Sequence, residues 1–123
     1  MKRRKVTPAQ DAIELVPVPD PTGAARTLQR MFGQQLTAVM VGIADPTKIG
    51  RWARGEESPP VDLARRLIRA VRIVELLKER QSDEDVQAWF MGRNAQLGGK
   101  APALVVASDP DRVEDAACAF LAY

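Results

Sequence analysis

The sequence predicts an all-α protein, and three observations support this prediction. Apolar residues recur three and four positions apart along most of the chain after residue 21, as expected where one side of each helix faces a core. The segments with this spacing are separated by glycines, which commonly end helices. Several segments also begin with an acidic residue or serine followed by proline, a combination typical of a helix start.

Length and composition limit the kinds of protein this chain can be. At 123 residues with 46% apolar content, it is long enough for one packed domain with tails or a small appendage. It has no run of about eighteen apolar residues and no signal-peptide layout, so we expect a soluble, cytoplasmic protein without a membrane partner. A single cysteine, Cys118, cannot form an internal disulfide, which suits a reducing compartment.

Catalytic and metal chemistry find little support in the residue types. The chain has no histidine and one cysteine, which removes the usual zinc sites and the histidine-based catalytic triads. It also lacks a glycine-rich phosphate loop. We therefore expect a protein that is not an enzyme and that has no metal and no cofactor.

Charge is distributed unevenly although the net charge is only +2. Residues 1–80 hold fifteen basic and nine acidic residues, whereas residues 81–123 hold three basic and seven acidic residues. The first part suits a phosphate-bearing partner, and the second would be repelled by one. The two parts are therefore expected to have different partners.

Residues 1–21 are predicted to form a flexible tail, because four prolines, Pro21 the last, oppose regular helix there. The basic cluster at residues 2–5 either enters a minor groove as an arm or is a solvated terminus. Apolar side chains later in the tail either pack on the core or on another subunit: Ile13, Leu15, Val16 and Val18.

Residues 22–80 are predicted to form a helix-turn-helix module. A supporting helix covers residues 22–33, and a second begins near Gln35 and ends at Gly42, with Leu36, Val39 and Met40 facing the core. Its partner helix starts with Asp45 as N-cap and Pro46 at the first position. That helix buries Ile49 and Trp52 and ends at Gly55 in a left-handed cap.

The exposed side of the second helix of this motif predicts a DNA contact. Arginine pairs with guanine edges or holds phosphates, lysine acts as a point charge, and side-chain amides donate to phosphates. The turn before this helix is one residue longer than in many such motifs, so its angle to the groove is expected to differ. The candidate DNA-binding residues on the second helix are Thr47, Lys48, Arg51 and Arg54. At the start of the first helix of the motif, Gln34 and Gln35 either donate to a phosphate or form an ordinary polar helix start.

A long helix is predicted from the Ser58-Pro59-Pro60 segment to about Arg80, with Ser58 or Asp62 serving its N-terminal dipole. Its apolar stripe is wide enough to bury against more than one neighbour, and it suits a homodimer. Three arginines share one side of this helix, where they are solvated or contact phosphate or a partner: Arg65, Arg69 and Arg72.

Residues 81–123 are predicted to form three short helices separated by glycine turns. The first begins at Ser82, and Asn94 caps a short turn after it. The second begins at Pro102, and the third begins with Asp109 followed by proline. Helices this short must lean on the long helix, on a second copy or on another protein.

Residues 86–104, VQAWFMGRNAQLGGKAPAL, resemble the toxin-binding domain of Xre/MbcA/ParS-type antitoxins. In that family a helix ending in tryptophan leads to an Asn-x-x-Leu-Gly turn and then to a Pro-x-x-Leu helix, and an Xre-like helix-turn-helix precedes the domain. The resemblance runs from about Leu36 to the end of the sequence. The motif positions, which are expected mainly to build the fold, are Trp89, Asn94, Leu97, Gly98 and Pro102.

This resemblance implies an antitoxin of a type II toxin–antitoxin system. In the family the C-terminal part covers the active-site entrance of a RES-domain toxin that consumes NAD, and the complex often represses its own promoter through operator DNA. Carried onto this sequence, the residues expected to contact toxin are Phe120, Leu121 and Tyr123, with Asp111, Glu114 and Asp115 as an acidic rim. The alternative is a stand-alone helix-turn-helix transcriptional regulator whose C-terminal helices dimerise it.

Overall fold

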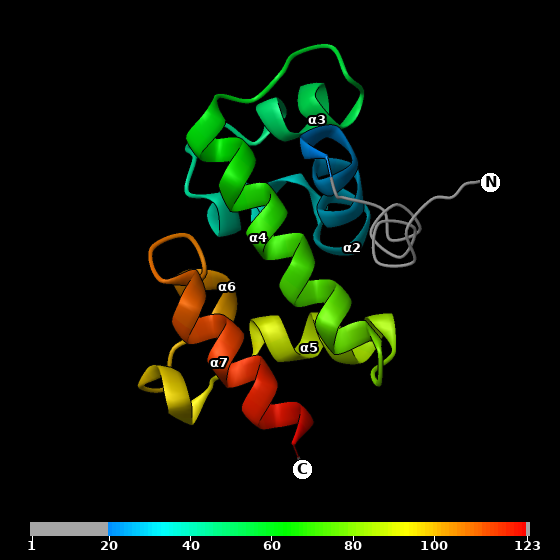
Figure 1. The fold of residues 1–123 in the computed structure, drawn as a ribbon. Coiled ribbons are helices and arrows are strands. Elements are labelled where there is room, and N and C mark those ends of the chain that lie inside the picture. The colour runs from blue at the N-terminus through cyan, green and yellow to red at the C-terminus, as the bar shows by residue number, and fades with distance from the viewer. Residues whose placement is uncertain (1–19, 123) are drawn as a thin grey trace, which may run out of the picture.

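The structure, a computed structural model, describes residues 20–122 and confirms the predicted all-α fold (Figure 1). Within this part of the chain there is no strand, only an isolated bridge between Asn94 and Lys100. None of its helices is both long enough and apolar enough to cross a membrane. The elements in order are α2 (Pro21–Val41), α3 (Thr47–Ala53), α4 (Val61–Lys78), α5 (Asp83–Met91), the short 3₁₀ helix η1 (Ala95–Leu97), α6 (Pro102–Val105) and α7 (Pro110–Leu121).

Helix α4 runs through the middle of the molecule and joins its two ends. It packs against α2 and against α5, and α7 lies along it from Arg69 toward its C-terminal end (Figure 1). Leu67, Val74 and Leu77 on its apolar stripe are fully buried. The prediction that this stripe packs against more than one neighbour is therefore confirmed, since α4 contacts α2, α5 and α7.

Helix α2 contains the break that the sequence predicted at Gly33. Gly33 has φ 82° and ψ 168°, so the segment consists of two helices joined by a kink. After the kink, Thr37 and Met40 are buried, but Val39 is 44% exposed. The prediction that Val39 faces the core was therefore wrong, whereas the prediction for Met40 was right: the inward side of this second half is centred on Thr37, Met40 and Val41.

The start of α2 also corrects the predicted boundary of the tail. Asp20 caps the helix by accepting a hydrogen bond from the N–H of Gly23 at 2.5 Å, and Pro21 is its first residue. These two residues therefore belong to the helix, because proline is favourable at a first helical position. The predictions for the basic cluster at residues 2–5 and for the apolar residues 13–18 lie outside the described residues.

Side-chain caps start two of the later helices as predicted. The N–H of Asp85 donates to Ser82 Oγ at 3.1 Å, and the N–H of Arg112 donates to Asp109 Oδ1 at 3.2 Å. Helix α4 differs, because it begins directly after Pro60 and no side chain caps it. Of the two residues expected to serve its N-terminal dipole, Asp62 lies in the first turn, whereas Ser58 is separated from the helix by two prolines.

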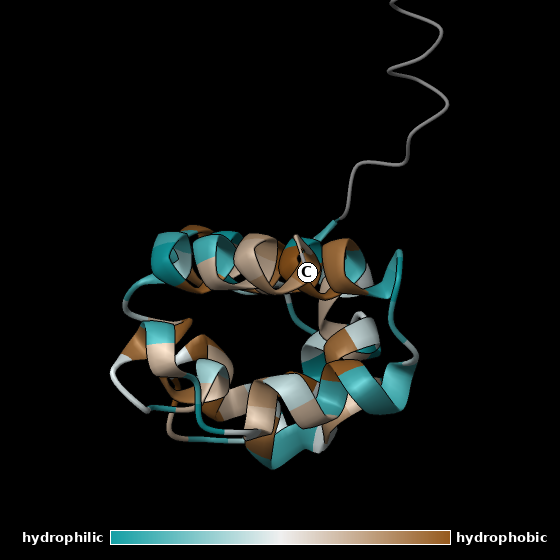
Figure 2. Ribbon diagram, turned by 90° about the horizontal axis from the view of Figure 1, so that it is seen from below, coloured by the Kyte–Doolittle hydropathy of each residue, from teal (hydrophilic) through white to brown (hydrophobic). Residues whose placement is uncertain are grey.

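One hydrophobic core spans both ends of the chain, and it contains Trp52 from α3 and Phe90 from α5. Hydrophobic and hydrophilic residues alternate around the helices, as amphipathic packing requires (Figure 2). The Nε2 of Gln87 donates to the carbonyl of Met31 at 2.6 Å, and an Nη of Arg66 donates to the carbonyl of Val41 at 2.9 Å. Residues 81–122 thus pack directly on the helices that precede them.

Candidate functional site

The turn at residues 42–46 places the short helix α3 on the surface. The chain enters α3 through Asp45, whose carboxylate accepts from the backbone N–H of Thr47 at 3.0 Å and from its hydroxyl at 2.6 Å. These hydrogen bonds, helped by the nearby charges of Arg51 and Lys48, lower the pKa of Asp45. The predicted N-cap at Asp45 and first helical position at Pro46 were each one residue early, because the regular helix begins at Thr47 and Pro46 occupies the N-cap position. Asp45 still accepts a hydrogen bond from the first N–H of the helix.

After α3 the chain turns back on itself at Gly55. Gly55 adopts a left-handed conformation with φ 76°, its N–H donates to the carbonyl of Trp52 at 3.1 Å, and the N–H of Glu56 donates to the carbonyl of Arg51 at 2.9 Å. This pair of bonds is a Schellman motif. The motif leaves Glu56 and Glu57 beside the last turn of α3.

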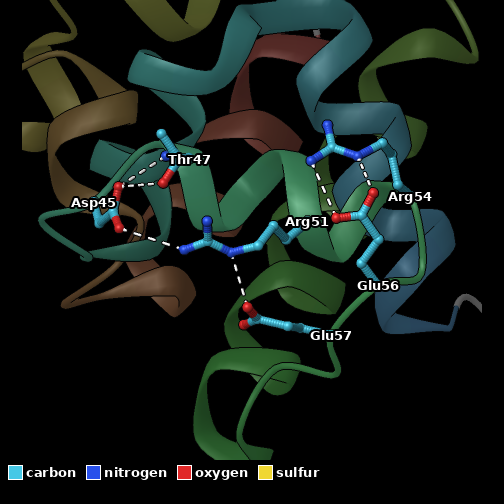
Figure 3. Close-up of polar contacts among 6 residues, drawn as sticks. All are labelled: Asp45, Thr47, Arg51, Arg54, Glu56 and Glu57. Atoms are coloured by element: carbon cyan, nitrogen blue, oxygen red, sulfur yellow. Dashed lines mark hydrogen bonds and ion pairs between the residues drawn. The ribbon is translucent and has the colours of Figure 1, made fainter.

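Both arginines of α3 are paired with carboxylates from its flanking segments (Figure 3). Arg51 Nε lies 2.8 Å from Glu57 Oε2, an ion pair rather than an aligned hydrogen bond, and its Nη2 lies 3.7 Å from Asp45 Oδ2. Arg54 Nε donates to Glu56 Oε2 at 2.6 Å. This hydrogen bond raises the pKa of Arg54 and lowers that of Glu56.

The predicted DNA-contacting face is therefore charged but internally compensated. Thr47 and Lys48 are exposed, yet the Thr47 hydroxyl is already hydrogen-bonded to Asp45. Lys48 borders an open groove of about 510 Å³ between the turn and the start of α4, and Asp45 and Glu57 border it too. Sequence reasoning missed the pairing. The signal for it was the position of two glutamates directly after the glycine that ends the helix.

The two glutamines predicted to face DNA differ in their surroundings. Gln34 is half-buried, and its Nε2 donates to Gln29 Oε1 at 3.0 Å. The same nitrogen lies 2.5 Å from where a Cβ on Gly50 would be, so Gln34 occupies the space that this glycine leaves on α3. Gln35 is exposed. Gln34 thus helps α2 pack on α3, and only Gln35 is open to a phosphate.

A second surface lies at the C-terminal end of α7. The apolar stripe of this helix begins with Val113, Ala116 and Ala117, all at most 2% exposed, but it ends with Phe120, which is 43% exposed. The Phe120 ring lies 6.3 Å from the ring of half-buried Trp89. The rest of the chain therefore buries most of this stripe and leaves Phe120, at its end, partly exposed to solvent.

Open grooves lie on both sides of Trp89 and Phe120. One, of about 360 Å³, is also bordered by Arg93 and Gln96, and the other, of about 440 Å³, by Asp85. Phe120 and Leu121 were predicted to contact the toxin, whereas Trp89 was predicted only to stabilise the fold. Leu121 packs against the core, and its carbonyl accepts from Arg80 Nη1 at 3.0 Å.

Two residues of the predicted acidic rim are paired with an arginine, and the third is exposed. Arg69 Nη2 donates to Asp111 Oδ1 at 2.7 Å and to Glu114 Oε1 at 3.2 Å, which fastens α7 to α4. The hydrogen bond with Asp111 is the main cause of the raised pKa of Arg69. Asp115 is exposed. Tyr123 lies outside the described residues.

The positions that carry the family resemblance set the local backbone. The carboxamide of Asn94 accepts from the N–H of Gln96 at 2.9 Å and starts η1. Leu97 is buried, and Gly98 follows in the left-handed conformation with φ 68°. Pro102 is buried at the first position of α6.

No protein-family model, curated protein or solved structure matches this chain. The resemblance to Xre/MbcA/ParS-type antitoxins therefore stays a prediction from the residues quoted above. Across residues 20–122, no group of acidic and cysteine side chains is arranged to hold a metal ion.

Proposed function

We propose that this chain is the antitoxin of a type II toxin–antitoxin system and acts in the cytoplasm by binding, without catalysis of its own. Its partner is a RES-domain toxin that consumes NAD. The surface around Trp89 and Phe120, the C-terminal face, covers the entrance to the toxin's active site. The observation that carries the proposal is the open aromatic end of α7, where Phe120 stands beside Trp89 between two grooves.

An exposed aromatic residue of this kind is well suited to anchor a protein partner. Burying a phenylalanine side chain contributes about 1.5–3 kcal/mol, and aromatic anchors carry much of the energy of many interfaces. Phe120 is positioned by three buried residues of the same stripe, so little conformational freedom is lost when it binds. Within the proposal, exposed Asp115 and half-buried Leu121 also contact the toxin, while Asp111 and Glu114 hold α7 in place through Arg69. The predicted contact by Tyr123 lies outside the described residues.

The experiment is a co-expression assay with the toxin, combined with a binding measurement on purified proteins. Phe120→Ala is expected to weaken toxin binding by about 30-fold or more, as for an interface hot spot, and to abolish protection of the cells. Val61→Ala is the matched control, because Val61 is also an exposed apolar residue but lies at the start of α4, outside the segment that resembles the toxin-binding domain. Wild-type protection by Phe120→Ala, with an unchanged melting temperature, would contradict the proposal.

A point substitution is a sharper test than removing α7. Deleting residues 109–123 would remove Val113, Ala116 and Ala117 from the core and would leave Arg69 without its carboxylate partners. Such a deletion would lose toxin binding because the fold is damaged, whatever the role of Phe120.

A second proposed function is operator binding by a homodimer through α3. The observation that favours it is that Thr47 and Lys48 are exposed and Arg51 is half-buried on a helix whose opposite side is buried, with exposed Arg54 at its C-cap. The alternative is a stand-alone regulator dimerised by its C-terminal helices. In that case Phe120→Ala should dissociate the homodimer, and the wild-type chain should form no complex with the toxin. Size-exclusion chromatography with and without the toxin distinguishes this regulator from an antitoxin.

A further inference from the structure

The charges around α3 form local pairs. Between residues 45 and 57 there are three basic side chains, Lys48, Arg51 and Arg54, and three acidic ones, Asp45, Glu56 and Glu57. This balance contrasts with the excess of basic residues in residues 1–80 as a whole. Both arginines are in contact with a glutamate at 2.6–2.8 Å, and both glutamates follow the glycine that ends the helix.

We propose that Glu56 and Glu57 form an autoinhibitory contact that keeps the affinity of the α3 face for the phosphate backbone of DNA low. This inference rests on the operator-binding half of the proposed function. The Schellman turn at Gly55 is the part of the fold that brings the two carboxylates into position.

The physical reason is that a phosphate and a carboxylate compete for the same guanidinium. To bind DNA, each arginine must exchange its glutamate for a phosphate, and the displaced carboxylate then stays within the screening length of about 8 Å from that phosphate. An arginine that keeps its glutamate forms a pair without net charge, and therefore fewer counterions are released on binding. The Arg54–Glu56 pair is exposed and the Arg51 side chain is half-buried, so the exchange is expected to be easier at Arg54 than at Arg51.

The test compares Glu56→Gln/Glu57→Gln with wild type for binding to a DNA duplex of about 20 base pairs over a range of salt concentrations. Glutamine keeps the size of each side chain and removes its charge. We expect affinity to rise by about fivefold for each arginine released. We also expect the log–log salt slope to become steeper by about 0.9 for each new phosphate contact.

Two further variants make the result specific. Glu75→Gln/Glu79→Gln changes the net charge equally at exposed glutamates of α4 and its C-cap, so it should bind DNA as wild type does or only slightly more tightly. Adding Arg51→Ala and Arg54→Ala to the Glu56→Gln/Glu57→Gln protein should remove its gain. A gain of the same size in the α4 control, or one that survives loss of the arginines, overturns the inference.

The same titration separates failure of the inference from failure of operator binding. If wild type and Glu56→Gln/Glu57→Gln bind DNA with the same affinity and the same slope, the inference fails and operator binding stands. If no variant binds DNA at the lowest salt, both fail, while the antitoxin proposal still depends on Phe120→Ala. Melting temperatures close to wild type show that each variant is folded.

Discussion

The α3 face and the Trp89–Phe120 face are both on the surface, but they differ in whether their side chains already have partners within the chain. On α3 each arginine finds a carboxylate within six residues along the chain. At the end of α7 the chain leaves an aromatic ring 43% exposed. Water and local ion pairs satisfy exposed charges, whereas apolar surface leaves water only when another surface covers it. The C-terminal face therefore has more to gain from a protein partner than the α3 face has from DNA.

The largest effect that sharpens this comparison is expected from two phenylalanines of the C-terminal region. Phe90 is fully buried, with its ring centroid 5.3 Å from Phe32 and 5.1 Å from Trp89. Phe90→Ala should lower the free energy of unfolding by about 3–5 kcal/mol, and Phe120→Ala by less than about 1 kcal/mol. Urea denaturation measures both. Equal losses would make Phe120 a core residue and would remove the contrast between the two faces.

A medium effect is expected at the two glycine turns that flank α3. A Cβ on Gly42 would lie 2.9 Å from Arg66 Nη1 and 3.2 Å from Ala107 Cβ, whereas one on Gly55 would meet nothing within 4 Å. Both glycines have positive φ, so alanine is strained at either position. Gly42→Ala should cost about 2–3 kcal/mol and Gly55→Ala about 1 kcal/mol, as measured by thermal unfolding.

Similar losses for the two variants would show that the turn at Gly42 is no more tightly packed than the one at Gly55. The structure indicates otherwise, because Arg66 also donates to the carbonyl of Val41 beside Gly42. The entry to α3 is thus held by the rest of the protein. Its exit is also held, by a hydrogen bond from Arg26 Nη2 to the carbonyl of Ala53 at 3.2 Å, but no atom crowds the space where a Cβ on Gly55 would lie.

The smallest effect is expected on the pH dependence of stability. The pKa values of Asp45 and Glu56 are lowered by hydrogen bonds from Thr47 and Arg54, respectively. A carboxylate with a depressed pKa stabilises the fold in full above its unfolded-state pKa of about 4, and this contribution is lost as pH falls through the folded-state value. Carboxyl-carbon NMR titrations should therefore give midpoints below the ordinary values for both residues. In Thr47→Val the midpoint of Asp45 should rise, and that of Glu56 should not.

The sequence predicted most of the helices because their starts and ends depend on nearby residues. Ser82, Asn94 and Asp109 accept backbone hydrogen bonds from residues two or three positions ahead, so their roles are visible in a short window. Val39 was misplaced because the side of α2 that faces the core depends on the direction of the kink at Gly33. That direction is set by packing against other helices.

The candidate site was harder to predict for the same reason. Counting basic residues on α3 gave no information on Glu56 and Glu57, whose positions depend on the conformation of the turn at Gly55. The exposed edge of Trp89 depends on where α7 ends, and the pairing of Arg69 with Asp111 joins residues 42 positions apart. Such contacts are decided by tertiary packing, which spacing along one helix does not report.

The hydrogen bond from Gln87 to the carbonyl of Met31, just before the kink, joins residues 56 positions apart. Closing a segment of that length costs conformational entropy before the contact is made. As the chain leaves the ribosome, the helices before residue 80 are complete first, and the C-terminal helices dock on them only later. The surface around Phe120 is therefore complete only after α7 has docked on the elements that precede it, α4, η1 and α6.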